Sequence, residues 1–134
     1  MTPGVSINQA PKPAQPPTLD AQVFCATTID IVRAHVPTIV GNLAATDSLI
    51  AQAPGDARER LRPHVAGLVA TGSALARRLL RAVDLALYTL AGSAEEVDLP
   101  TADDLREQLL GLADDLAGLL VRLSCVEAQL DRVD

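Results

Sequence analysis

The 134-residue sequence has very few aromatic residues: Phe24 and Tyr88 are the only two, and there is no Trp. Aromatic side chains are among the residues that β-strands favour, so their scarcity disfavours a sheet protein. Apolar residues nevertheless make up 49% of the chain, and Leu, Val, Ile and Ala supply most of them. Such side chains suit close packing of helix on helix, and the composition therefore predicts an all-α fold.

Cysteine and lysine are also scarce. Cys25 and Cys125 are too few and too far apart for a disulfide framework. Lys12 is the single lysine, and the net charge of −6 argues against a general binder of nucleic acid or anionic membranes. The N-terminus has no basic region followed by an apolar core, so a cytoplasmic protein is expected. The richness in Arg, Ala, Leu and Asp, which have GC-rich codons, suggests a bacterial source.

Motifs that carry chemistry are missing from the sequence. It has no glycine-rich phosphate loop, Cys-x-x-Cys pair or calcium loop. His35 and His64 have no acidic residue or second His three or four positions away, the spacing that a metal site on a helix would use. Each flanks an apolar stripe, so each is expected to be half-buried. We expect no enzymatic activity, no cofactor and no metal.

No membrane span is expected from the sequence. Within the helical region, the longest stretch without Asp, Glu, Lys or Arg covers residues 63–76, which is fourteen residues. That stretch contains Pro, His, Gly, Thr and Ser, and it is shorter than the roughly 20 residues that a spanning helix needs.

The most regular pattern lies in the last quarter of the chain. Apolar residues recur there in alternating steps of four and three, which brings them to one side of an α-helix. We call this set the leucine seam; it consists of Leu105, Leu109, Leu112, Leu116, Leu119, Leu123, Val126, Leu130 and Val133. The pattern predicts a helix from Thr101, as its N-cap, to Val133, and such a seam must pack on other helices to leave water.

Two further helices are predicted upstream. The first should run from Thr18, as its cap, to Gln52, with a kink or a break near Pro37, so that two shorter helices are an alternative. The second should run from Ala57 to Ala91, capped by Asp56, with an irregular first turn because of Pro63.

The predicted organisation is an arm followed by one domain. Residues 1–17 contain five prolines and no apolar periodicity, so they are expected to form an extended or disordered arm. An arm that lies on a neighbouring subunit is the alternative. Residues 18–134 should form an antiparallel, up-down-up bundle of three long helices, because short turns make sequential helices antiparallel neighbours.

Two surfaces are candidates for binding. The first is a partner or oligomer interface on the seam, formed by Leu109, Leu112, Leu116, Leu119, Leu123 and Leu130. Gly111 and Gly118, seven residues apart, would let another backbone come close. The second is a set of arginines that could contact an anion or an acidic partner: Arg77, Arg78 and Arg81.

Charge is unevenly distributed between the last two predicted helices. Residues 55–81 carry six Arg against two acids, and residues 95–134 carry eleven acids against three Arg. The simplest use of this asymmetry is attraction between the second and third helices.

The sequence therefore predicts a non-enzymatic structural or adaptor protein. It should be a bundle that forms a homo-oligomer and docks a protein partner. A further form of this hypothesis makes it a component of a larger assembly. The alternative function is a regulatory domain that binds a small ligand through its apolar interior or through the Arg face of the second helix.

Overall fold

Three long helices make up the part of the chain that the structure, a computed structural model, describes, which is residues 20–93 and 97–131. They are α1 (Ala21–Gln52), α2 (Gly55–Gly92) and α3 (Leu99–Asp131). Each helix packs against both of the others, and the described residues contain no β-strand. The predicted all-α helical bundle is confirmed. The predicted arm, residues 1–17, lies outside the described residues.

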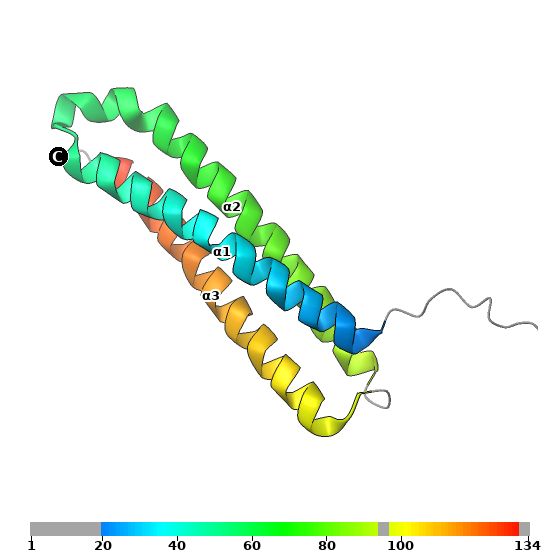
Figure 1. The fold of residues 1–134 in the computed structure, drawn as a ribbon. Coiled ribbons are helices and arrows are strands. Elements are labelled where there is room, and N and C mark those ends of the chain that lie inside the picture. The colour runs from blue at the N-terminus through cyan, green and yellow to red at the C-terminus, as the bar shows by residue number, and fades with distance from the viewer. Residues whose placement is uncertain (1–19, 94–96, 132–134) are drawn as a thin grey trace, which may run out of the picture.

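The helices lie side by side over most of their length (Figure 1). In that view α2 returns alongside α1, and α3 returns alongside α2. Two contacts agree with this course. Cys25, near the start of α1, donates its thiol hydrogen to the carbonyl of Ala86, near the end of α2 (3.4 Å). Arg33 of α1 donates to Oε1 of Gln108 in the first half of α3 (2.9 Å). At 1.5 Å per residue, α1 is about 48 Å long.

The helix starts differ from the predicted ones by a few residues. The carboxylate of Asp20 accepts hydrogen bonds from the backbone of Gln22 and Val23, so Asp20 is the cap of α1. Asp98 takes the corresponding role at α3, because its carboxylate accepts from both the backbone and the hydroxyl of Thr101 (3.2 and 2.8 Å). Thr101 therefore lies in the first turn rather than at the cap. An aspartate satisfies the free N–H groups and also suits the positive end of the helix dipole.

Both internal prolines lie within continuous helices. α1 runs through Pro37 as one helix, so the alternative of two helices is wrong, whereas the predicted kink stays a prediction. α2 starts at Gly55, two residues earlier than predicted, and contains Pro63 in its third turn. The prediction that Asp56 caps this helix is wrong, because the cap is Pro54 and Asp56 lies in the first turn. Both prolines are exposed, so the backbone carbonyl that each leaves without a helical donor can reach water.

The core is built almost entirely from aliphatic side chains of all three helices. Two buried threonines are exceptions, and each donates its hydroxyl to the carbonyl four residues earlier: Thr28 to Phe24 and Thr46 to Asn42. Gly72 of α2 marks a close approach between two helices. A Cβ there would lie 3.3 Å from Cδ1 of Leu123 on α3, so the absent side chain lets these helices pack tightly.

Candidate interaction surface

The leucine seam, from Leu105 to Val126, lies inside the chain rather than on its surface. Five of the six leucines predicted as a partner interface have exposed fractions between 0% and 9%: Leu109, Leu112, Leu116, Leu119 and Leu123. Leu130, the sixth, lies in the last turn of α3, and its side chain is outside the described part. The periodicity correctly marked a face that must leave water, but α1 and α2 of the same chain cover it. These five leucines are therefore not available to a partner in this structure.

The predicted arginine set is exposed. Arg77, Arg78 and Arg81 all lie on the outer surface of α2, with Arg77 and Arg81 one helical turn apart. Arg78 also lines a shallow hollow with Ala70, Thr71, Ala74 and Leu75. These side chains are placed where an acidic partner could reach them, and their role as contacts stays a prediction.

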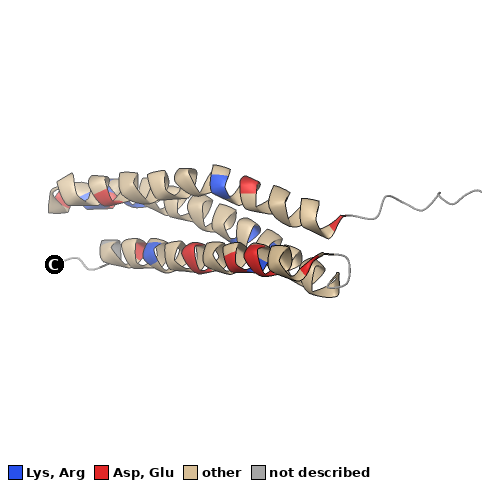
Figure 2. Cartoon of the chain, turned by 60° about the horizontal axis from the view of Figure 1, so that its bottom comes forward, with Lys and Arg blue, Asp and Glu red and all other residues tan. Residues whose placement is uncertain are grey.

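The expected charge attraction between α2 and α3 stays a prediction. Two ion pairs of the described residues each lie within one helix, between residues three positions apart. They join Glu59 to Arg62 on α2 (3.6 Å) and Asp103 to Arg106 on α3 (3.1 Å). Their side chains are at least one third exposed, so such pairs contribute only about 0–1 kcal/mol each. The acidic residues of α3 from Asp103 to Glu127 are exposed, and Figure 2 shows acidic positions spread along the α3 ribbon.

Side chains that could react or bind a metal do not gather in one place within the described part of the chain. Both histidines are exposed rather than half-buried as expected. Within residues 20–93 and 97–131, no cluster of three or more His, Cys, Asp or Glu side chains could hold a metal ion. Cys25 is buried, and its burial raises the pKa of the thiol, whereas Cys125 is exposed. A raised pKa keeps Cys25 in the unreactive thiol form at neutral pH.

Helix α1 carries several exposed apolar residues. It is long enough and apolar enough to cross a membrane, although core helices of soluble proteins meet the same two criteria. Only 28% of its most apolar 18-residue window is buried. Val23, Ile31 and Val40 are exposed by 59%, 46% and 43%. Sequence reasoning missed this surface, because the signal lies in apolar residues outside the core stripe and not in an uninterrupted apolar run.

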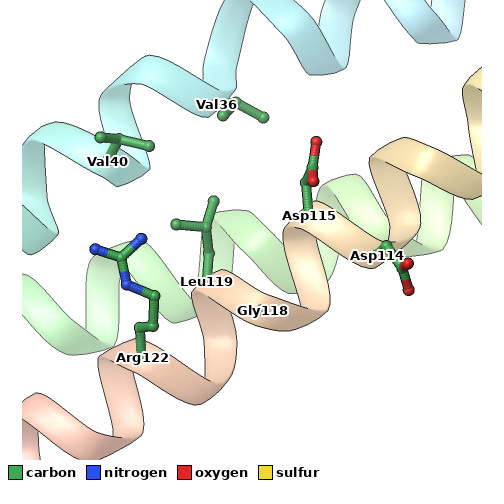
Figure 3. A pocket seen from close by; sticks show the side chains of 7 residues that line it. All are labelled: Val36, Val40, Asp114, Asp115, Gly118, Leu119 and Arg122. Carbon is green, nitrogen blue, oxygen red and sulfur yellow. The ribbon is translucent and has the colours of Figure 1, made fainter.

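A groove runs between α1 and α3 beside Val40 (Figure 3). It has a volume of about 330 Å³, and its lining residues are Val36 and Val40 from α1 and Asp114, Asp115, Gly118, Leu119 and Arg122 from α3. Asp115 and Arg122 point toward α1, and Asp114 points away from it (Figure 3). We call this surface the α1–α3 groove. It combines an apolar floor with two opposite charges on its rim.

Gly118 leaves the α3 side of the α1–α3 groove open. A Cβ built on Gly118, or on Gly111 one heptad earlier, would meet no atom within 4 Å. The predicted close approach of a backbone at these glycines therefore does not occur within the described part of the chain. A ligand or a partner chain that binds in the groove at Gly118 would contact exposed backbone.

Comparison of the chain with models of protein families, with curated proteins and with solved structures finds no match in any of the three.

Proposed function

We propose that this chain is a non-enzymatic structural or adaptor protein. In this proposal, an up-down-up bundle of three helices carries an extended Pro-rich arm, associates with copies of itself and docks a protein partner. The observation that carries the proposal is the exposed apolar surface of α1, where Val40 is 43% exposed and most of the apolar window is unburied. Large exposed apolar surfaces usually mark sites of association.

Two further observations support association with protein rather than with a small molecule. The α1–α3 groove is open along one side of the bundle, whereas small-molecule sites bury most of their ligand. The exposed arginines of α2, Arg77 and Arg81, lie one turn apart and suit the carboxylates of an acidic protein segment.

The test of self-association is the mass in solution. Light scattering coupled to size-exclusion chromatography, over a wide range of concentration, should give a multiple of the 14.0 kDa of one chain. A mass of one chain at every concentration would refute the self-association.

Docking of a partner needs a separate experiment. A pull-down from the native host with the wild-type chain should recover a protein that an Arg77→Ala/Arg81→Ala variant recovers poorly. A thermal-shift screen with phosphorylated and apolar small molecules tests the alternative function. A chain that stays monomeric and gains stability from one such molecule would favour the ligand-binding alternative.

A further inference from the structure

We propose that a second copy of this chain covers the α1–α3 groove, in an antiparallel dimer with two-fold symmetry. The two-fold axis would lie in the interface, perpendicular to the helices, and would cross α1 at Val40 and α3 next to Gly118. This inference rests on the proposed self-association and specifies which face carries it. Its basis is the distribution of charge along each of the two helices.

The α1 side of the proposed interface is a stripe of five residues. Arg33, Val36, Val40, Ala44 and Asp47 follow one another in steps of three and four, so they share one face of the helix. Val36 is half-buried and the other four are exposed. Arg33 and Asp47 lie seven residues on either side of Val40, about 10 Å each way along the axis. The stripe therefore has an apolar centre, a positive end and a negative end. The guanidinium of Arg33 also donates to Oε1 of Gln108 in its own α3, so the positive end lies at the α3 edge of the stripe.

Such a stripe is complementary to itself only when the second copy runs in the opposite direction. In a two-fold interface each residue meets the counterpart that lies equally far beyond the axis. With the axis at Val40, Arg33 faces Asp47 of the second copy, and Asp47 faces its Arg33. A parallel arrangement of the two α1 helices would instead put Arg33 against Arg33 and Asp47 against Asp47.

The α3 side shows the same symmetry at the same level. Asp115 and Arg122 are seven residues apart, and the midpoint between them falls between Gly118 and Leu119. In an antiparallel pair of α3 helices, Asp115 would face Arg122 of the second copy. Val40 and Leu119 line the same groove, and Figure 3 shows them opposite each other. One axis therefore satisfies both helices, and the dimer gains four ion pairs.

The size of the overlap is also adequate. α1 extends twelve residues beyond Val40 to its end at Gln52, and α3 extends about as far beyond Gly118 to Asp131. Two helices of about 10 Å diameter that overlap over about 36 Å would cover roughly 700 Å² per copy. That area is close to the roughly 800 Å² per partner of a standard specific interface. Gly118, with nothing within 4 Å of its Cβ position, lets the second backbone come close at the axis.

Charge reversal provides a sharp experiment. Arg33→Asp leaves two aspartates facing two aspartates across the axis, and Asp47→Arg leaves two arginines facing two arginines. Each change replaces two attractions by two repulsions, so each variant alone should dimerise about 10- to 100-fold more weakly than wild type in sedimentation equilibrium. Arg33→Asp/Asp47→Arg should dimerise as wild type does, because the reversed charges again face opposite ones.

Mixing the two single variants tests the axis directly. In a heterodimer of Arg33→Asp with Asp47→Arg, the contact between the two unaltered residues and the contact between the two substituted ones are both attractive. Native mass spectrometry of the mixture should therefore show mainly the heterodimer. An interface that places α1 against α3 of the copy would give no such rescue, because the aspartate introduced by Arg33→Asp would then face acidic α3. Absence of the heterodimer, or a double variant weaker than both single ones, would overturn the proposed axis.

Val40 and Val23 provide a matched pair for the face itself. Val40→Glu places two carboxylates against each other at the axis and should abolish the dimer. Val23→Glu makes the same change on the same helix, outside the stripe, and should leave the dimer intact. Both valines are more than 40% exposed, and an unchanged circular dichroism spectrum confirms that the bundle folds.

The outcomes separate this inference from the proposed function. A wild-type chain that is monomeric throughout refutes self-association and the dimer together. A wild-type dimer that none of the Arg33, Asp47 and Val40 variants weakens refutes the α1–α3 face and leaves self-association standing.

Discussion

Leu116→Ala is the most direct test of where the leucine seam is buried. Leu116 lies at the middle of α3, and its exposed fraction is 0%. The substitution removes three carbon atoms, which at about 0.8 kcal/mol per buried CH₂ amounts to about 2.4 kcal/mol of transfer free energy. The surrounding helices relax only partly, so a cavity adds to this loss, and the free energy of unfolding should fall by about 3–5 kcal/mol.

Leu110→Ala is the matched control. Leu110 lies on the same helix, but it is 52% exposed and faces away from the core. Its truncation loses little buried surface and gains some helix propensity, so the free energy of unfolding should fall by about 1 kcal/mol or less. Urea unfolding followed by the helical signal in circular dichroism gives both values.

The dependence on protein concentration decides between a seam buried within one chain and a seam buried between chains. Because the seam is covered by helices of its own chain, the loss caused by Leu116→Ala should be the same at every concentration at which the chain is monomeric. A loss that disappears on dilution to the monomer, or one no larger than that of Leu110→Ala, would refute burial of the seam within the chain. For the same reason, Leu116→Lys/Leu123→Lys should unfold the chain itself instead of dissolving an assembly, because a lone charge in the core is costly.

Glycines, cysteines and the cap of α3 offer three more tests. Gly67→Ala should raise the free energy of unfolding by about 0.5–1 kcal/mol, because a Cβ there meets nothing within 4 Å. Gly72→Ala should raise it by less in the same urea experiment, because its Cβ would lie 3.3 Å from the packed side chain of Leu123. A thiol reagent should label Cys125 in the native protein and Cys25 only after unfolding. Asp98→Ala should lower the melting temperature at neutral pH. Hydrogen bonds from the hydroxyl and the backbone of Thr101 hold the pKa of the Asp98 carboxyl below its ordinary value. The stabilisation is lost once that carboxyl is protonated, so the difference in melting temperature should shrink as the pH falls below about 4.

Helix ends show how closely the sequence predicts local structure. The predicted and observed starts differ by two to three residues. At α1 and α3 the reason is that Thr and Asp are both good caps and both occur near each start, whereas α2 begins after Pro54 without a side-chain cap. The choice depends on which carboxylate or hydroxyl reaches a free N–H group in three dimensions, as Asp98 does toward Thr101. Pro63 shows the same limit, since its cost was outweighed by burial of the residues that follow it, such as Val65.

The binding surfaces show what sequence patterns do not predict, which is the partner against which a helix face packs. Both the leucine seam and the stripe on α1 repeat in steps of three and four, and periodicity alone assigns each to one side of a helix. The sequence pattern led us to expect a partner on the seam, yet Leu116 and Leu123 are covered by the same chain, while Val40 on α1 remains exposed. Periodicity states that a face must pack, but it does not state against what.

The sequence by itself determined that the chain is helical and which residues leave water, because these properties follow from local propensity, periodicity and the scarcity of aromatic residues. Only the tertiary structure decided that the seam is satisfied within the chain, that α1 keeps an exposed apolar face, and that Val40 and Leu119 lie at one level across a groove. These properties depend on how three rods of limited width are placed around one core, which is a relation between residues far apart in the chain and has no local signal.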